Sequence, residues 1–300
     1  MTDDLTLLID GSSLIYRAYF SMPDSVRAPD GSGINAARGF LGMVTRLVDD
    51  HRPARICCAT DESWRPEWRV ELIDTYKTHR TEPGSVQQQA DAEIARQMPI
   101  IFELLTLCGI KVVGHPEYEA EDVIGTLVAR ASGRVGIVSG DRDLFQLVRD
   151  PDVWVLYPKK GVSVVDRVDE AYIEERYGIP GRSYRDYAVL RGDASDGLPG
   201  VRGIGEKLAA SLVARYGSID AIISAAESDG GGTAVSKVRR DLDYVKRAVE
   251  VVTIAADLPL PDEDLSRPRG EPPPELAELA QRHGLGNVVN RLVIALRSDP

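Results

Sequence analysis

Short apolar runs alternate with segments of helical periodicity along the first half of the chain, and no other feature constrains the fold as strongly. Strands that are separated by helices form parallel sheets, because each crossover returns the chain to the same side of the sheet. The predicted strands are residues 5–10, 54–60, 110–113, 135–139 and 153–158. The predicted helices are residues 36–50, 90–108 and 121–131, with another beginning at 143–148. The sequence therefore predicts an α/β fold with a central, mostly parallel sheet flanked by helices.

Carboxylates lie at or just beyond the ends of these strands. Asp10 ends the first predicted strand, Asp61 follows the second, and Asp141 follows the fourth. The carboxyl ends of parallel strands share one edge of a sheet, where α/β proteins bind their ligands. The segments YEAEDVI, SGDRDLF and RGDASDGLPG add Glu119, Glu121, Asp122, Asp143, Asp193 and Asp196. Carboxylates gathered at one edge need cations among them, and such hard oxygen ligands favour two or more Mg²⁺ or Mn²⁺ ions, as phosphodiester hydrolysis requires.

Each acidic segment also has a simpler explanation when it is taken alone. The acidic residues of YEAEDVI begin a predicted helix, where the helix dipole favours negative charge. Those of SGDRDLF follow a strand and suit an ordinary capped turn. Those of RGDASDGLPG flank glycines and suit a turn as well. Their occurrence together, in one chain and at strand ends, favours a common site.

A glycine-rich segment, LPGVRGIGEKLAASL, predicts a helix–hairpin–helix. Gly200, Gly203 and Gly205 would allow backbone N–H groups to approach a phosphate at the start of the next helix. Arg202 and Lys207 would add positive charge. A tight pair of helices without a ligand is the alternative. The hairpin would hold a DNA backbone without reading its sequence.

Two regions depart from the strand and helix alternation. Residues 62–98 are predicted to form a lid or arch over the edge of the sheet, because they are too long for a tight connection. Within them Tyr76, Lys77 and Arg80 offer an aromatic ring and positive charge, which suits single-stranded nucleic acid, although a helix end with solvated cations is the alternative. From about residue 170 the pattern changes to short helices and glycine turns, with an irregular connection at 261–274 and a last helix at 275–298.

The formal net charge of −11 argues against a nucleic-acid partner when it is taken alone. Nine of these negative charges belong to the carboxylates named above, so the rest of the chain carries a formal charge of −2. The acidic balance is therefore largely a property of the predicted site. Basic patches elsewhere on the surface remain compatible with this composition.

Several features predict a cytoplasmic protein without a membrane segment. No apolar run approaches the roughly 18 residues of a membrane span. The acidic N-terminus leads directly into a strand, which is unlike a secretory signal. The three cysteines lack metal-ligand spacing and are expected to be buried, reduced thiols.

The segments LLIDGSSLIYRAYF, DTYKTHR, YEAEDVIGTL, GDRDLFQL and GDASDGLPGVRGIGEKLA together resemble the 5′ nuclease superfamily. The most similar branch is that of bacterial 5′–3′ exonucleases, which occur alone or as the N-terminal domain of DNA polymerase I; flap endonucleases belong to the same superfamily. The resemblance runs from Leu7 to about Leu258. It implies a PIN-like nuclease core at 1–175 with the arch, and a helical subdomain at 176–300 with the helix–hairpin–helix at about 190–215.

The resemblance also implies roles for individual residues. The first metal cluster would comprise Asp10, Asp61, Glu119 and Glu121. The second would comprise Asp122, Asp141, Asp143, Asp193 and Asp196. Lys77 and Arg80 would contact the scissile phosphate, and Tyr16 and Tyr76 would stack on a base near the cut. The segment Gly200–Lys207 would hold duplex phosphates, and its carbonyls would hold K⁺.

One position departs from the bacterial pattern. That pattern usually reads Glu-Ala-Asp-Asp, whereas this chain has Glu119, Ala120, Glu121 and Asp122. Glutamate at the third place is typical of flap endonucleases of other lineages. The extra methylene keeps the charge but changes the reach, so both direct and water-mediated metal ligation by Glu121 remain open.

The resemblance implies a stand-alone, monomeric, structure-specific 5′ nuclease that hydrolyses DNA by a two-metal mechanism. Its expected substrates are DNA with a 5′ single-stranded end or flap and RNA–DNA primer junctions, and its expected role is removal of RNA primers or 5′ flaps in replication and repair. Two alternatives are a catalytically silent DNA-binding protein and an RNA-directed nuclease with a PIN-type fold. The carboxylate set argues against the first, because unfilled acids would repel DNA. The hairpin argues against the second.

Overall fold

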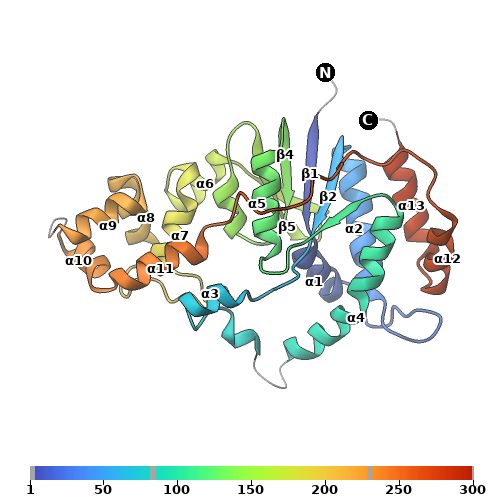
Figure 1. Cartoon of the computed structure of the whole chain (residues 1–300), viewed down its shortest axis with the longest axis horizontal. Helices are drawn as coiled ribbons and strands as arrows, with labels where there is room; N and C mark the ends of the chain where they lie inside the picture. The colour runs from blue at the N-terminus through green and yellow to red at the C-terminus, as the bar shows by residue number, and fades with distance from the viewer. Residues whose placement is uncertain (1–3, 82–85, 229–231, 299–300) are drawn as a thin grey trace.

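A six-stranded sheet forms the centre of the molecule, which is described by a computed structural model over residues 4–81, 86–228 and 232–298 (Figure 1). The strand order is β3-β2-β1-β4-β5-β6. The strands are β1 (Leu5–Asp10), β2 (Arg55–Ala59), β3 (Lys111–Val113), β4 (Arg134–Val138), β5 (Val153–Lys160) and β6 (Val164–Val168). The first five are mutually parallel, which confirms the prediction, and β6 returns antiparallel to β5. Strand β6 was not predicted, because its mixed sequence VVDRV lies largely exposed at the sheet edge.

The strand register places the predicted acidic residues at one edge. Asp10 pairs with Ala59 of β2, and its neighbour Ile9 pairs with Val138 of β4. Asp61 therefore lies two residues beyond the end of β2, and the segment after Val138 begins beside the end of β1. Parallel pairing thus brings segments far apart in the sequence to a single edge.

The two faces of the sheet have separate hydrophobic cores. Buried strands alternate their side chains, so Leu7 and Ile9 of β1 pack on one face and Leu8 on the other. The first face is covered by α1 (Gly11–Ser21), α2 (Asn35–His51) and α4 (Val86–Leu107). The second face is covered by α5 (Ala120–Arg130) and by helices of the C-terminal half. Cys57, Cys58 and Cys108 are buried and unbridged.

Helices extend the molecule beyond β6 (Figure 1). They are α6 (Glu170–Tyr177), α7 (Tyr184–Arg191), α8 (Glu206–Tyr216), α9 (Ile219–Glu227), α10 (Gly232–Arg240) and α11 (Leu242–Val252). An irregular segment then returns across α5, where the Arg130 guanidinium donates hydrogen bonds to the carbonyls of Leu258 and Leu260. This connection agrees with the predicted break in regular structure. The division of the chain near residue 175 remains a prediction.

The predicted last helix at 275–298 is wrong in one respect, because it is two helices. They are α12 (Pro274–Arg282) and α13 (Gly286–Arg297). Gly284 separates them with a φ of 67°, a left-handed conformation that ends the first helix. Both helices pack with α2 and α4 at the opposite end of the molecule from α6 to α11 (Figure 1).

Two other segments differ from the sequence prediction. The residues predicted to begin a helix at 143–148 form only a short 3₁₀ turn, η2 (Asp143–Leu147). The arch contains α3 (Glu67–Leu72), η1 (Thr78–Thr81) and the first turns of α4, while its residues 82–85 lie outside the described part of the chain. Among the described helices, none alone is long and apolar enough to cross a membrane; α8 and α9 pass that test only as a pair bent by 89°.

Two helical glycines should respond oppositely to alanine. A Cβ on Gly125 of α5 would lie 2.4 Å from the Ala255 carbonyl oxygen and 2.4 Å from the Ile254 side chain, whereas a Cβ on Gly42 of α2 meets nothing within 4 Å. We expect Gly125→Ala to lower the free energy of unfolding by about 1–3 kcal/mol, because backbone must move. Gly42→Ala should raise it by about 0.5–1 kcal/mol. Urea denaturation checks both, and equal effects would contradict the close packing of α5.

Candidate active site

The carboxylates at the strand ends lie close enough to raise one another's pKa. Burial, followed by repulsion from Asp61, raises the pKa of Asp10 to about 7. Burial and Glu119 raise the pKa of Asp61. Burial and Asp141 raise the pKa of Asp143 well above its ordinary value. The edge therefore collects negative charge that the protein alone does not fully balance.

Asp10 and Asp61 are fixed by hydrogen bonds to neighbouring elements. Asp10 caps α1, since its Oδ1 accepts the N–H of Ser13 at 3.0 Å. Its Oδ2 accepts the hydroxyl of Ser139, just after β4, at 2.5 Å. Asp61 accepts the N–H of Ala120, at the start of α5, at 2.6 Å. These bonds join the end of β1 to the segment after β4, and the segment after β2 to the start of α5.

A second acidic group lies beside the first. Asp141 accepts the N–H of Asp143 at 2.9 Å. Asp193 and Asp196 come from the loop between α7 and α8, and both add to the repulsion that raises the pKa of Asp143. Burial raises the pKa of Asp196 to about 6, against the attraction of Lys77. The loop before the hairpin thus contributes to the same acidic site.

Asp122 does not have the exposed oxygens expected of a metal ligand. It is fully buried, and its Oδ1 accepts a hydrogen bond from Arg69 at 2.9 Å and another from the N–H of Ala255 at 3.0 Å. Its Oδ2 accepts the N–H of Glu119 at 3.2 Å, which completes a capping box at the start of α5. The structure therefore corrects this prediction: Asp122 orients Glu119 and Arg69 instead of facing the site.

Arg69 is a central residue that the sequence analysis missed. Its side chain is fully buried, and its Nη1 lies 2.9 Å from Glu121 Oε1 while its Nη2 lies 2.9 Å from Asp122. It also pairs with Glu119. Three acidic side chains of one motif therefore share one guanidinium from the arch. A lone arginine in a short, highly charged helix gives no sequence signal of this role.

Lys77 and Arg80 also lie among the carboxylates. Lys77 is buried, pairs with Glu119, and has its Nζ 4.0 Å from Asp196 Oδ1. Burial alone would raise the pKa of Glu119, but Lys77 and Arg69 outweigh it and lower that pKa. The Arg80 guanidinium lies 2.9 Å from Asp196 Oδ1 and is partly exposed. The predicted basic pair is thus placed at the acidic site.

The two tyrosines predicted to stack on a base have different surroundings. Tyr76 is only 2% exposed, and its hydroxyl donates to Glu119 at 2.6 Å, so in this conformation it has no free ring face to offer. The predicted stacking of Tyr76 on a base is therefore corrected, because the arch packs on the acidic site and buries the ring. Tyr16 is partly exposed and donates to Asp91 of α4 at 2.6 Å. Tyr16 thus joins α1 to α4, and its stacking on a base stays a prediction.

The donor set suits divalent metal ions in its chemistry. All its ligands are carboxylate oxygens, which Mg²⁺ and Mn²⁺ prefer, and several have raised pKa values that a cation would lower. Among the described residues, however, no three acidic, histidine or cysteine side chains converge on one point as metal ligands do. Arg69, Lys77 and Arg80 hold oxygens that a metal ion would need. Ion binding would therefore require some of these ion pairs to open.

The glycine-rich hairpin joins α7 to α8 as predicted, but its glycines differ in role. Gly200 is buried, its N–H donates to the hydroxyl of Tyr244 at 2.9 Å, and an added Cβ would lie 2.3 Å from the Arg191 carbonyl. Its predicted phosphate contact is corrected: Gly200 allows the two helices to approach closely. Gly203 and Gly205 are exposed, next to the start of α8.

The predicted basic residues of the hairpin are exposed. The N–H of Arg202 donates to Asp241 at 2.9 Å, and its side chain faces solvent. Lys207 is exposed in the first turn of α8. Lys237 of α10, which the sequence analysis did not select, donates to the Gly203 carbonyl at 2.8 Å and adds another cation. The hairpin surface is therefore positively charged at a helix N-terminus.

Solved structures of low sequence identity share the fold. The 5′-exonuclease of bacteriophage T5 with bound zinc superposes with a TM-score of 0.67 at 15% identity, covering 97% of this chain and 98% of that one. The catalytic core of Rad2 in complex with DNA substrate has a TM-score of 0.60 at 18% identity, covering 98% and 92%. The fold is that of PIN-like 5′ nucleases, as predicted.

Sequence comparison gives the family. The model for the 5′–3′ exonuclease N-terminal resolvase-like domain matches residues 5–178, and that for the C-terminal SAM fold matches 179–272. The chain therefore belongs to the 5′–3′ exonuclease family. It is a nuclease, a hydrolase that acts on DNA phosphodiesters.

Full-length relatives support this assignment. A 5′–3′ exonuclease of Streptomyces coelicolor is 47% identical, with 97% of this chain and 99% of the relative covered. One from Mycobacterium tuberculosis is 41% identical, with 98% of both chains covered. DNA polymerase I of Mycobacterium tuberculosis is 39% identical, but only 27% of its length is matched. The predicted resemblance to both stand-alone exonucleases and polymerase nuclease domains is confirmed.

Removing the Arg69 charge should destabilise the acidic site. We expect Arg69→Met to lower the free energy of unfolding by about 3–5 kcal/mol in the presence of a chelator, because three buried carboxylates lose their shared partner. The control is Arg46→Met, whose exposed pair with Asp50 should contribute at most about 1 kcal/mol. Chemical denaturation measures both; similar effects would show that Arg69 does not stabilise the site.

Proposed function

We propose that this exonuclease cleaves DNA at 5′ single-stranded ends and flaps, using two or more Mg²⁺ or Mn²⁺ ions held at the strand-end carboxylates. The observation that carries the proposal is that acids from the ends of β1 and β2, the segment after β4 and the loop before the hairpin lie at one edge of the sheet. Their raised pKa values indicate a site built for added positive charge. The zinc-bound T5 5′-exonuclease supports the same chemistry.

We assign the carboxylates to two metal clusters, as the family resemblance implies. Asp10, Asp61, Glu119 and Glu121 form the first proposed metal cluster. Asp141, Asp143, Asp193 and Asp196 form the second. Divalent ions bound there would supply charge neutralisation and an activated water, which phosphodiester hydrolysis needs. Ser139 and Ala120 hold Asp10 and Asp61 in place through hydrogen bonds.

Lys77 and Arg80 would act as electrostatic clamps on the scissile phosphate. Both are already at the acidic site, where Glu119 and Asp196 are their partners. A DNA phosphate offers these cations a competing anionic partner. Lys77 has a left-handed backbone, φ 49°, and its N–H donates to the Asp196 carbonyl at 2.9 Å, so its position is set by the loop before the hairpin. Cleavage and duplex binding would thereby be coupled.

The hairpin would bind the duplex through its phosphates. Gly203, Gly205 and Lys207 present backbone and charge at the start of α8. We extend the proposal to K⁺ at the hairpin carbonyls, to a monomer in the cytoplasm, and to RNA–DNA primer junctions as substrates in replication and repair. The Rad2 core bound to a DNA substrate supports docking of a duplex on this fold.

Cleavage of a labelled 5′-flap duplex tests the proposal. We expect a metal-dependent product in Mg²⁺ or Mn²⁺ and none with a chelator, because the acidic site alone would repel the phosphate. Single-stranded RNA of the same sequence should be cleaved far more slowly, since it cannot engage the hairpin. Faster cleavage of the RNA would favour the RNA-directed alternative, and absence of any metal-dependent product would refute the nuclease mechanism.

Asp141→Asn provides the matched variant for this assay. It removes one charge from the second proposed cluster and keeps the size of the side chain. We expect at least about a 100-fold loss of cleavage, with DNA affinity unchanged or improved because repulsion falls. Equal loss of cleavage and affinity would show that Asp141 has a structural role.

Lys77→Met should slow the chemical step. We expect the single-turnover cleavage rate to fall about 100-fold, while the DNA dissociation constant changes little. Lys111→Met is the control, because Lys111, at the start of β3, is exposed and pairs with Glu263, which is not one of the site residues. If Lys77→Met changes only the salt dependence of binding, Lys77 is a positioning contact and not a catalytic one.

A further inference from the structure

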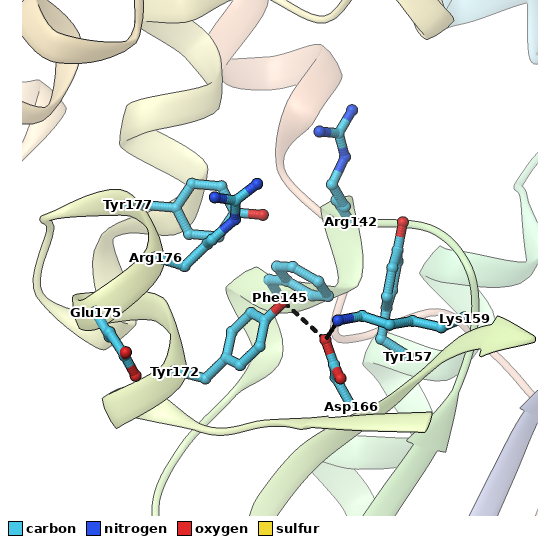
Figure 2. A pocket seen from close by; sticks show the side chains of 9 residues that line it. All are labelled: Arg142, Phe145, Tyr157, Lys159, Asp166, Tyr172, Glu175, Arg176 and Tyr177. Atoms are coloured by element: carbon cyan, nitrogen blue, oxygen red, sulfur yellow. Dashed lines mark hydrogen bonds and ion pairs between the residues drawn. The ribbon is translucent and has the colours of Figure 1, made fainter. Parts of the chain in front are cut away.

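An open cavity of about 610 Å³ lies outside the acidic site, at the sheet edge opposite to the arch. The hairpin β5–β6, the turn η2 and helix α6 enclose it (Figure 2). The arch connects β2 to β3, so the acidic site lies between the arch and this cavity. The proposed mechanism does not use the cavity. Its size is in the usual range for small-ligand sites.

Aromatic rings form much of the cavity wall. Phe145 is buried, with ring centroids 5.5 Å from Tyr157, 6.4 Å from Tyr172 and 6.4 Å from Tyr177. Phe145 and the three tyrosines pack on the same hydrophobic core, but the tyrosines are also partly exposed. Among the described residues, the hydroxyls of Tyr157 and Tyr177 have no hydrogen-bond partner. The wall therefore offers ring surface and free polar groups together.

Cations border these rings. Lys159 pairs with Asp166 at 2.6 Å, and Arg142 lies 3.6 Å from Asp193 of the acidic site. Within the described part of the chain, Arg176 has no ion pair, and it lines the cavity together with Tyr177 (Figure 2). The acids Asp166 and Glu175 leave the lining with a net positive charge. Such a combination of rings and cations suits an anion that carries an aromatic base.

Arg142 connects the cavity to the proposed cleavage site. It stands between Asp141 and Asp143 in the sequence, so its backbone belongs to the acidic loop while its side chain lines the cavity. A strand held at the acidic site would therefore lie near the cavity, because Arg142 is 3.6 Å from Asp193. A paired base is stacked within the duplex and is not available to enter. Only an unpaired nucleotide has a free base face.

We propose that this cavity binds one unpaired nucleotide of the DNA substrate, on the side of the acidic site away from the arch. The base stacks on Tyr157, Tyr172 or Tyr177, and its phosphate pairs with the cations of the lining, Arg142, Lys159 and Arg176. This inference rests on the proposed function, because it takes DNA at the acidic site as given. It adds a contact that would select substrates with an unpaired base beside the cut.

Photo-cross-linking tests the placement directly. A flap substrate carrying a single 5-iodouracil is bound in the presence of a chelator, and the label is moved through each unpaired position in turn. We expect one position to cross-link to a peptide that contains Tyr157, Tyr172 or Tyr177. If every labelled position cross-links only to the arch or to the glycine-rich hairpin between α7 and α8, the proposal is overturned.

Matched variants give a second readout. The double variant Lys159→Ala, Arg176→Ala should weaken binding of the substrate with the unpaired nucleotide about tenfold, and leave a fully paired duplex within about twofold. Lys160→Ala is the control, because Lys160 is the exposed neighbour of Lys159 and does not line the cavity. Equal weakening of both substrates would reject a site for an unpaired base.

Wild-type cleavage of the flap substrate, measured in parallel, separates the two proposals. If the wild-type protein cleaves with metal but no cavity peptide cross-links, only the cavity assignment fails. If it neither binds nor cleaves the substrate, the proposed function fails and the cavity assignment falls with it.

Discussion

Neutralisation of buried negative charge is the constraint on which the rest of this structure depends. Parallel strands deliver carboxylates to one edge, and each additional one raises the cost of keeping its neighbours ionised. Two buried cations from the arch, Arg69 and Lys77, partly neutralise this charge by pairing with Glu119 and its neighbours. Because a buried charge without a partner costs several kcal/mol, these cations and acids must fold as a unit.

Because these cations and acids fold together, the arch is joined to the loop that precedes the glycine-rich hairpin. The Thr75 hydroxyl donates to the Gly197 carbonyl at 2.7 Å, and a Cβ on Gly197 would lie 2.1 Å from the Thr75 carbonyl oxygen. Only glycine allows this approach, and Gly197 also has a φ of 70°. The contact brings the arch cations to Asp196. The backbone thereby places the arch cations on one side of the acidic site and the glycine-rich hairpin on the other.

The sequence predicted those features that depend on local periodicity and on motifs. Five parallel strands, the acidic edge and the start of α8 follow from alternating apolar runs and from glycine and acidic motifs. It did not predict Arg69, because the partners of a lone arginine are set by tertiary packing. For the same reason Asp122 was predicted to bind a metal ion and Gly200 a phosphate. Membership of a motif does not show which polar groups already have partners within the protein.

Arg69 and Arg142 both lie at the acidic site, but they differ in burial and in their number of partners. Arg69 is buried and holds acidic residues together from the arch side. Arg142 is 41% exposed and touches the acidic site only through Asp193, at 3.6 Å. A buried guanidinium with several partners is too costly to release, whereas a partly exposed one can exchange its partner for a phosphate. Of these two arginines, Arg142 is therefore the one that can exchange its partner for a phosphate, whereas Arg69 keeps the acidic residues in place.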